Sequence, residues 1–484
     1  MISHFNDLPL ELLPLIVQYL LRPSHLAIAC RVNRSFYTFS IPLLYERVFI
    51  YAWHKEGKAK VIKLFKTLAD YPHLAKLVQQ LGMGLLLFSF PPPSAMTSSA
   101  IRDFPKALQT EDYDLVLAAC LDGIRNCVNL RACTWTRHGS LTSSVLSTLV
   151  ECSRLQELEI NGEHAGFYDP AILPRFTHLR KLSLIMPSAA VASMLLPWCK
   201  NTSGTLQYLS VICQSSPRIN DEVVASIAPY VTNLEYIYFV GCPKLTHDGL
   251  WTLLSGNYKG VVGLGMEGLS TAFDMHAFSE LCTHHNTLSR LRSITLTVDE
   301  HTALDEWQKS VLALLSHAPL QQFHISTVGG HVNHRLDDAF CAAVVSAHGS
   351  RITRFSVHRM RMTIDAIMDI CRRCVVLEQL FIVVEQDDLD ALGPCLAQAP
   401  KLRAVHINRP LDFGSEDVPK QSLDLILSIA RQCRPTVRQF GFNTRVFQVD
   451  RNVHSNADGT TDVNVALSSY EIPEIPEQFL VVRT

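Results

Sequence analysis

The stretch Leu155-Gln-Glu-Leu158-Glu-Ile160 decides the fold, because its pattern recurs along most of the chain. Each copy has an apolar residue, two variable residues, a second apolar residue, a variable residue and a third apolar residue. Twelve copies follow one another at intervals of 24 to 35 residues, and they begin at Leu130, Leu155, Leu179, Leu206, Leu234, Val261, Leu291, Leu320, Ile352, Leu377, Leu402 and Val437. So short a unit has too little apolar surface for a core of its own and must stack on its neighbours. The spacing therefore predicts a solenoid.

The segments between the copies have helical spacing, and most begin with a residue that can cap a helix. Four such residues are Asp221, Asp248, Asp305 and Asp365. A carboxylate at this position accepts free backbone N–H groups and faces the positive end of the helix dipole. The unit is therefore strand, loop, helix, loop, as in a leucine-rich repeat. Right-handed crossovers between such units predict an α/β solenoid with parallel strands on the concave face and helices on the convex face.

Cysteines mark the joint between helix and strand in several copies. Cys127, Cys152 and Cys374 lie three residues before the first apolar residue of a copy, and Cys433 lies four before. A small apolar thiol suits such a tight joint. The sequence has 14 cysteines, and acidic residues and prolines interrupt any signal-peptide pattern near its start. We therefore expect free, buried thiols and an intracellular protein of the cytoplasm or nucleus.

Composition limits the classes of partner. With 484 residues and 48% hydrophobic content, the chain can bury a large continuous core. The net charge of −2 favours neither nucleic acid nor an anionic membrane surface, since both select strongly basic faces. The longest apolar run, Met83 to Phe90, ends at three prolines and is too short to span a bilayer. We expect no nucleic-acid partner and no membrane partner.

The chain is expected to have four parts. These are a helical head (1–47), a helical connector (48–77), the solenoid (78–444) and a polar C-terminal tail (445–484). Val78-Gln-Gln-Leu81-Gly-Met83 fits the strand pattern and is expected to supply the first solenoid strand. The tail lacks a packing pattern, which predicts a mobile segment or an extended cap over the last repeat.

The head carries the most specific motif. Asp7-Leu8-Pro9-Leu10-Glu11-Leu12 leads into an apolar helical segment, and Ile41-Pro42-Leu43-Leu44-Tyr45 closes the head. A helix that begins near Glu11 holds Pro14 in its first turn, where the missing N–H costs nothing. This sequence resembles an F-box over residues 5 to about 47. The whole chain is similar to F-box leucine-rich-repeat proteins of the fungal type.

The resemblance implies a docking site for a Skp-type adaptor. In the F-box family this segment inserts into a groove of the adaptor, which assigns adaptor contact to Leu8, Pro9, Glu11, Leu12, Ile16, Leu26, Val32 and Phe36. The alternative is that several of these residues, Ile16 and Phe36 above all, only hold three helices together. Helical spacing places a set of apolar side chains on one face, namely Leu12, Leu15, Ile16, Tyr19 and Leu20.

An F-box protein performs no bond chemistry itself. The resemblance implies a non-catalytic substrate-recognition subunit of an SCF-type ubiquitin ligase, in the Ubl conjugation pathway. Its partners would be the adaptor, a cullin scaffold and an unknown target protein, and it would act by bringing the target close to activated ubiquitin. Two alternatives stay open: a leucine-rich-repeat protein-binding scaffold outside a ligase, and a receptor whose concave face takes a small apolar molecule.

Target contact is expected on the concave strands, where side chains alternate and every second one faces outward. Aromatic residues are favoured interface anchors, which selects Tyr208, Tyr236 and Tyr238. A second, more polar group comprises His324, Arg354, His358 and His406. The alternative is that both groups only shield the strands from water.

Two apparent ligand motifs have simpler explanations. Gly263-Leu-Gly-Met-Glu-Gly268 matches a dinucleotide-binding pattern, but it lies across a repeat that already explains Leu264 and Met266. Cys371-Arg-Arg-Cys374 has redox-type spacing, yet no second pair stands at zinc-ribbon distance, and Cys374 is at the recurring joint. We therefore expect no cofactor, no metal and no catalytic residue.

Overall fold

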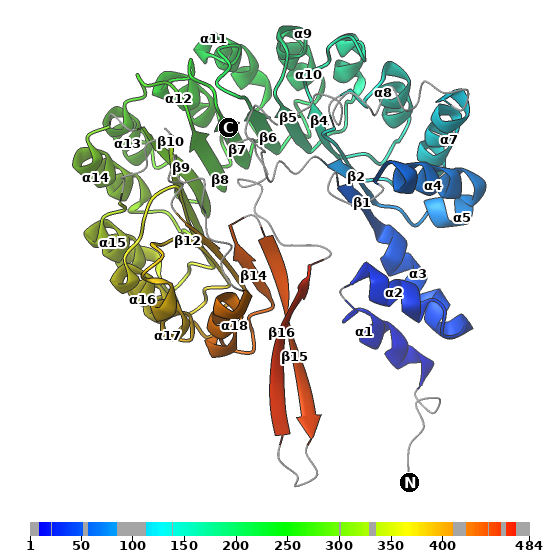
Figure 1. The fold of residues 1–484 in the computed structure, drawn as a ribbon. Helices are drawn as coiled ribbons and strands as arrows, with labels where there is room; N and C mark the ends of the chain where they lie inside the picture. Colours follow the sequence, from blue (N-terminus) through cyan, green and yellow to red (C-terminus); the bar gives the residue numbers. More distant parts are fainter. Residues whose placement is uncertain are drawn as a thin grey trace, which may run out of the picture. The chain divides into compact units, whose positions relative to one another are not determined.

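The computed structural model of the chain describes residues 9–20, 22–51, 57–84, 113–137, 139–299, 302–328, 335–409, 423–443, 445–455 and 461–470. It contains two compact units, Met1–Ile212 and Cys213–Thr484, each built of strands that alternate with helices (Figure 1). The predicted α/β class is confirmed in both units.

The first unit begins with the helices of the head. These are a 3₁₀ turn η2 (Leu10–Leu12), α1 (Leu13–Val17), α2 (Pro23–Ala29) and α3 (Arg34–Glu46). Six strands follow: β1 (Arg47–Tyr51), β2 (Gln80–Gly84), β3 (Ala132–Trp135), β4 (Glu157–Asn161), β5 (Lys181–Ile185) and β6 (Tyr208–Ile212). Consecutive strands pair in parallel. The elements between them are α4 (Gly57–Asp70), α5 (Pro72–Ala75), α7 (Tyr113–Asn126), α8 (Ser143–Val150), η3 (Pro170–Arg175), α9 (Ala189–Ser193) and α10 (Leu195–Asn201).

The second unit repeats the same alternation. Its strands are β7 (Tyr236–Val240), β8 (Gly263–Glu267), β9 (Ser293–Asp299), β10 (Gln322–Val328), β11 (Arg354–His358), β12 (Gln379–Val383), β13 (Ala404–Asn408), β14 (Gln439–Phe442), β15 (Arg445–Ser455) and β16 (Thr461–Ser469). Strands β7 to β14 are parallel, whereas β15 and β16 are antiparallel.

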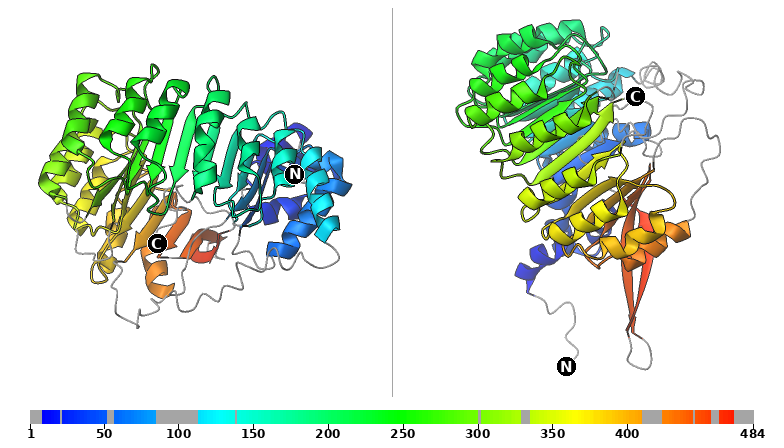
Figure 2. Two further views of the ribbon diagram at one scale, coloured as in Figure 1. Left: turned by 90° about the horizontal axis from the view of Figure 1, so that it is seen from above. Right: turned by 90° about the vertical axis from the view of Figure 1, so that its left-hand side faces the viewer.

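The helical elements of the second unit lie between these strands in sequence. They are α11 (Asp221–Ile227), η4 (Ala228–Tyr230), α12 (His247–Ser255), α13 (Met275–His284), α14 (Leu304–Leu315), α15 (Asp338–His348), α16 (Ile364–Arg373), η5 (Leu389–Ala391), α17 (Leu392–Leu396) and α18 (Leu423–Gln432). Within this unit the strands line the inner side of an arc and the helices stand side by side on its outer side (Figures 1 and 2). We call the helix-free side of these strands the inner face.

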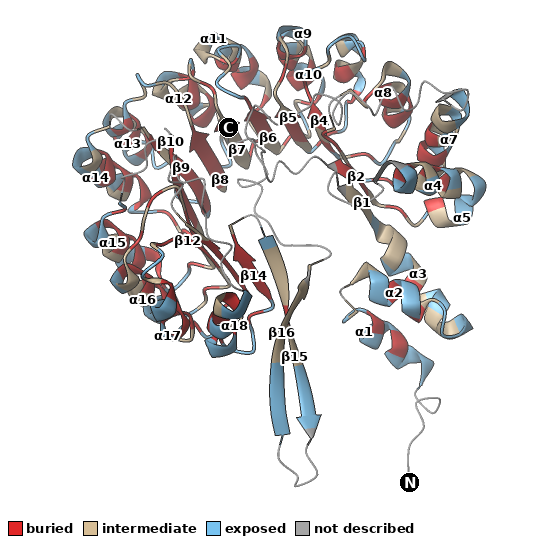
Figure 3. Ribbon diagram, in the orientation of Figure 1, coloured by how far each residue is buried: buried red, intermediate tan, exposed pale blue. Residues whose placement is uncertain are grey.

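The core lies between strands and helices, where the repeat pattern places it. Leu155, Leu158 and Ile160 are all buried, as are the equivalent residues of the other copies. The sheet is the most buried layer in both units, and the outer sides of the helices are exposed (Figure 3). The apolar positions of the repeat therefore form one buried stripe per unit.

Helix starts differ from the prediction by one or two residues. The residues that cap α11 and α16 are Asn220 and Thr363, whose side chains accept from Val223 N and Ala366 N. Thr246 caps α12, and Ala303, without a side-chain cap, precedes α14. The four predicted aspartates lie in the first turns instead, where their charge still opposes the helix dipole.

The expected helical connector begins with a strand. β1 follows α3 directly and pairs in parallel with β2, so the first strand lies one repeat before the one predicted at residues 78–83. The run Val48-Phe49-Ile50-Tyr51 has the β-branched and aromatic composition typical of a strand.

The expected unpacked tail contains a hairpin. β15 pairs with β14 through Phe440↔Phe447, and β16 pairs with β15 from Phe447↔Ser469 to Ser455↔Thr461. Part of the tail therefore extends the sheet beyond the last repeat, closer to the cap alternative. The signal in the sequence is Asp458-Gly459 between two alternating apolar runs, a pattern typical of hairpins.

The recurring cysteines close the turn that leads into each strand. The carbonyls of Cys127, Cys152 and Cys374 accept from Leu130 N, Leu155 N and Leu377 N at 2.9, 3.0 and 3.0 Å. All 14 cysteines of the chain are free, and burial raises the pKa of the Cys127 thiol to about 12. Burial likewise raises the pKa of the Cys152 and Cys374 thiols, so the three recurring thiols are protonated at neutral pH.

Candidate functional site

The core of the head is small and consists of few side chains. Leu13 and Val17 of α1 and Leu26 and Ala29 of α2 are buried, and both helices pack against α3. Pro14 lies in the first turn of α1, as predicted, and Asn33 caps α3 by accepting from Phe36 N at 3.0 Å. The core is therefore complete without the remaining apolar residues of the head.

Those remaining residues form an exposed apolar surface. Seven large side chains of η2, α1, α2 and the turns that follow these two helices are exposed, namely Leu10, Leu12, Leu15, Ile16, Tyr19, Ile28 and Val32. The exposed parts of α1 and α2 are visible in Figure 3. We call these seven residues the head surface. Single exposed apolar residues are ordinary, but such a concentration on a small helical unit is typical of a docking site.

Most of the predicted adaptor residues are accessible on the head. Pro9, Glu11, Leu12 and Val32 are exposed, and Ile16 is 38% exposed, so Ile16 is not a core residue. Phe36 is half-buried. Leu8 lies outside the described residues.

Leu26 differs from the other predicted adaptor residues that are described. Its side chain is only 7% exposed and forms part of the core of the head, and its contact with an adaptor stays a prediction. The sequence places Leu26 on the helix correctly, but spacing alone does not say which side of so short a helix faces inward.

The head is fixed to the first repeat without a linker. α3 ends at Glu46 and β1 begins at Arg47. The Glu46 carbonyl also accepts from Gln79 N, at the start of β2, at 3.0 Å. The end of the head is therefore part of the hydrogen-bonded framework of the first strands.

Two tyrosines of β7 lie over a glycine strand on the inner face of the second unit. Tyr236 pairs with Gly263 and Tyr238 with Gly265. A Cβ on Gly265 would lie 2.1 Å from Tyr238 Cδ1, and a Cβ on Gly263 would lie 2.4 Å from Tyr236 Cδ1. The Tyr238 hydroxyl reaches Ser293 Oγ on β9 at 3.5 Å. The glycines of the apparent dinucleotide motif therefore make room for two rings, which we call the tyrosine platform (Tyr236 and Tyr238).

The third predicted tyrosine has a different environment. Tyr208 belongs to β6 of the first unit, and Lys181 Nζ of β5 lies 4.5 Å from the centre of its ring. All three tyrosines are half-buried. Their predicted role in target contact stays a prediction.

The polar group is divided between buried and half-buried residues. His324 and His406 are buried: His324 Nδ1 lies 2.8 Å from Ser356 Oγ, and His406 Nε2 lies 2.8 Å from the Asn443 carbonyl. The predicted role of these two side chains in target contact stays a prediction. Arg354 and His358 are half-buried, and Arg354 Nε donates to Gln379 Oε1 at 2.5 Å.

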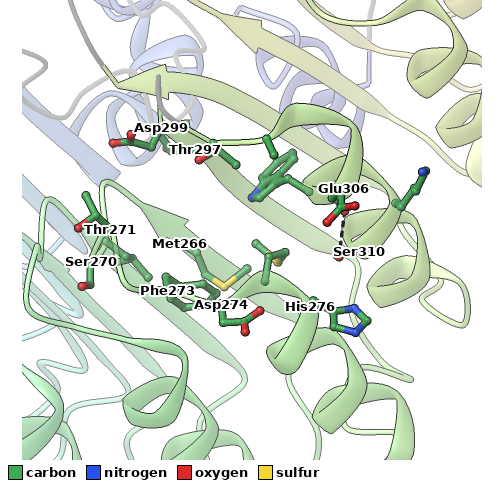
Figure 4. Close-up of a pocket in the computed structure, with 16 residues that line it drawn as sticks. Met266, Ser270, Thr271, Phe273, Asp274, His276, Thr297, Asp299, Glu306 and Ser310 are labelled. Atoms are coloured by element: carbon green, nitrogen blue, oxygen red, sulfur yellow. Dashed lines mark hydrogen bonds between the residues drawn. The ribbon is translucent and has the colours of Figure 1, made fainter.

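A cavity of about 530 Å³ lies at the ends of β8 and β9, beside the starts of α13 and α14 (Figure 4). Met266, Phe273 and Trp307 supply apolar lining, and Asp274 and Glu306 supply carboxylates. Asp274 caps α13 through Ala277 N at 3.0 Å. Ser310 donates to the Glu306 carbonyl at 3.0 Å, so its hydroxyl is engaged in the helix. The sequence pattern did not predict this cavity, because its lining combines residues of two strands, two helices and the loops between them.

The described residues also bear on metal binding and on membrane insertion. No three His, Cys, Asp or Glu side chains gather there into a set that could ligate a metal. Within the same ranges, no helix combines the length and apolar character needed to cross a bilayer.

Comparison with known proteins agrees with the head assignment. Residues 5–51 match the F-box-like family. A search of curated proteins found no match to the chain. Similar solved structures include a chain of the Rad7 and Elc1 complex in yeast, at 14% identity over 81% of this chain and 94% of that chain, with a TM-score of 0.37. Another is the leucine-rich repeat-containing protein LegL7 from Legionella pneumophila, at 9% identity over 63% and 90%, with a TM-score of 0.33. Both TM-scores are below 0.5, so the fold assignment depends on the strands and helices themselves.

Proposed function

We propose that this protein is the substrate-recognition subunit of an SCF-type ubiquitin ligase. The F-box head docks on a Skp-type adaptor and through it on a cullin scaffold, and the inner face of the repeats binds a target protein. The protein itself is non-catalytic and contributes proximity, because tethering a target raises the effective concentration of its lysines near activated ubiquitin. It acts in the cytoplasm or nucleus and resembles the fungal set of F-box leucine-rich-repeat proteins.

The head surface is the observation that carries this proposal. Its apolar side chains are exposed although the core of the head is already closed by Leu13, Val17, Leu26 and Ala29. Burying such a surface against a partner is favourable by about 25 cal/mol per Å² of apolar area. The match of residues 5–51 to the F-box-like family supports a Skp-type adaptor as that partner.

The direct test is co-purification of the full chain with a Skp-type adaptor and a cullin. We expect the wild type to retain both partners and a Leu12→Ala/Ile16→Ala variant to lose them. Truncation of two anchors in one interface should weaken binding at least tenfold, which corresponds to about 1.4 kcal/mol. Both side chains are accessible, so the variant should fold, which circular dichroism would verify.

Leu196→Ala is the matched control. Leu196 and Leu12 are both 40% exposed, but Leu196 lies on α10 within the repeats. The control should retain both partners. Retention of the adaptor without the cullin would favour a binding scaffold outside a ligase, and a folded wild type that binds no adaptor would refute the proposal.

A further inference from the structure

The outer part of the β15–β16 hairpin is a ribbon of only two strands. β15 pairs with β14 over residues 445–448 alone, whereas it pairs with β16 as far as Ser455↔Thr461. We call residues 452–455 and 461–464 the outer ribbon, whose described side chains are all exposed (Figures 1 and 3). A two-stranded hairpin alone is marginally stable in water and is normally supported by a third strand or a packed face. No described residue gives the outer ribbon that support.

The free edge of β16 lacks the usual protection of an edge strand. β16 is the last strand of the sheet and, within the described ranges, pairs only with β15. Edge strands normally carry lysine, proline or a bulge, which prevents pairing with a further strand. The nine residues of β16 include no lysine and no proline, and their register with β15 is continuous. This edge can therefore accept another strand.

One face of the hairpin has two apolar pairs, of which only one is covered. Val453 and Val463 of the outer ribbon lie directly opposite each other and are 64% and 56% exposed. Val449 and Leu467 form the equivalent pair nearer the base, on the same face because each lies four positions away along its strand. Val449 is buried and Leu467 is half-buried. The exposed valine pair is thus an apolar surface that the hairpin itself does not cover.

We propose that the free edge of β16 pairs antiparallel with β16 of a second copy of this chain. A twofold axis that pairs all nine residues of the strand passes beside Val465, which then lies opposite its own equivalent. In this register Val463 of each copy lies opposite Leu467 of the other. The exposed valine pair of one hairpin therefore continues into the basal apolar pair of the second.

The same register avoids repulsion and supports the ribbon. Asp462 is the single charged residue of β16, and it lies opposite Ser468 of the second copy. Like charges directly opposite each other would be destabilising, and this register has none. Two ribbons of two strands become one sheet of four strands with an apolar face, which is enough for independent stability. The second copy thus supplies what each hairpin lacks.

This inference goes beyond the proposed function and does not depend on it. Each copy contributes one head and one inner face. If the head binds an adaptor, the dimer carries two adaptors, and a target with two binding segments is held with higher avidity.

The first test is sedimentation velocity of the full chain over a hundredfold range of concentration. We expect the average mass to rise toward twice the monomer value. A Val463→Lys variant should need at least tenfold higher concentration for the same rise, because a charge is placed opposite Leu467 of the second copy. The exposed position of Val463 should preserve the fold, which circular dichroism would verify.

Val375→Lys is the matched control. Val375 is 51% exposed and lies in the turn before β12, so its variant should dimerise as the wild type does. Adaptor binding should be equal in both variants, which separates this inference from the proposed function. A wild type that stays monomeric over the whole range, or equal dimerisation of Val463→Lys, would overturn the inference.

Cysteine crosslinking tests the register. Residues directly opposite in antiparallel strands have Cα atoms about 4.5–5.5 Å apart, within the range of a disulfide. Oxidation with copper phenanthroline should therefore give a covalent dimer of Val465→Cys. Asp462→Cys is the control, because its two copies would lie about 20 Å apart, six residues along the strand. Crosslinking of Asp462→Cys but not of Val465→Cys would refute the register.

A chain ending at Tyr470 tests the competing occupant of this edge, residues 471–484 of the same chain. We expect the shortened chain to dimerise as the full chain does. If it dimerised while the full chain stayed monomeric, the following segment would cover the edge, and the inference would be overturned.

Discussion

Gly265 and Tyr238 show how a glycine can be required by a side chain on the next strand. The ring of Tyr238 occupies the place where a Cβ of Gly265 would be, 2.1 Å from Cδ1. Phe49 over Gly82 and His406 over Gly441 repeat the arrangement elsewhere on the strands. An aromatic ring that covers a glycine strand keeps the backbone from water and gives the sheet face a flat surface.

Substitution of Gly265 should therefore be destabilising. In a Gly265→Ala variant the ring of Tyr238 must move, and such overpacking typically costs about 1–3 kcal/mol. Gly204→Ala is the control, because a Cβ at Gly204 meets nothing within 4 Å. Urea denaturation should show a lower midpoint for Gly265→Ala alone, and equal midpoints for the two variants would contradict the packing described.

His406 should make stability depend on pH. Burial lowers the pKa of its imidazole from the usual 6.5, although the bond to the Asn443 carbonyl acts in the opposite direction. The folded protein therefore keeps His406 neutral, while the unfolded chain takes up a proton below about pH 6.5. The contribution of neutral His406 to the free energy of unfolding is therefore fully present above about pH 6.5. It is lost progressively as the pH falls below this value.

The measurement for His406 is the thermal midpoint between pH 7.5 and 5.5. We expect the midpoint to fall on acidification, and a His406→Gln variant to show a smaller fall. Some pH dependence should remain in the variant, because burial also lowers the pKa of His348. If the thermal midpoint fell equally with pH in both proteins, the pKa of His406 would be the same in the folded and unfolded states.

Neighbouring helices of the second unit are connected where they begin. The Asp221 carboxylate, in the first turn of α11, accepts from Thr246 N and Thr246 Oγ1, both at 2.8 Å. Gly249 leaves room for it, since a Cβ there would lie 2.3 Å from Asp221 Oδ1. Asp338 of α15 likewise accepts from the Thr363 hydroxyl at 3.0 Å. Such contacts couple one repeat to the next at the helix N-termini, in addition to the apolar core.

Removal of this connection should lower stability. Asp221→Ala leaves two donors of Thr246 without their acceptor, which typically costs about 1–3 kcal/mol. Asp248→Ala is the control, because Asp248 is an exposed first-turn residue of α12 whose carboxylate lies 3.7 Å from His247 Nε2. Chemical denaturation should give a lower midpoint for Asp221→Ala than for Asp248→Ala. A larger loss in Asp248→Ala would mean that dipole effects outweigh the contact between helices.

Local patterns predict some of these elements better than others. The apolar triplets predict strands correctly because the pattern directly reflects burial, as at Leu155, Leu158 and Ile160. The predicted cap positions are one or two residues too late, because Asn220 and Thr363 can also cap a helix and precede the aspartates. β1 and the β15–β16 hairpin were missed because neither has the repeat pattern, and pairing with a neighbouring strand determines both.

The candidate sites, too, were predictable where a local motif exists and not where contacts between segments decide. The F-box motif predicts the head residues, and most of them are exposed, but only packing shows that Leu26 is a core residue. The outward positions of the strands are predicted by alternation, yet the burial of His324 and His406 depends on contacts with Ser356 and Asn443. The tyrosine platform requires the register of β7 against β8, which no single segment of sequence contains.

The two functional surfaces lie on one chain whose head is joined directly to the repeats. The Glu46–Gln79 hydrogen bond and the absence of residues between α3 and β1 make the end of the head continuous with the first strands. This direct joint makes the head and the first strands parts of one compact unit.

The measurement that tests the central claim most directly is isothermal titration of the full-length wild type with a purified Skp-type adaptor at several temperatures. The account predicts saturable 1:1 binding with a negative heat-capacity change, because the apolar head surface becomes buried. The Leu12→Ala/Ile16→Ala variant should bind at least tenfold more weakly, and Leu196→Ala should bind as the wild type does. Absence of binding by the folded wild type, or binding that the double substitution leaves unchanged, would contradict the account.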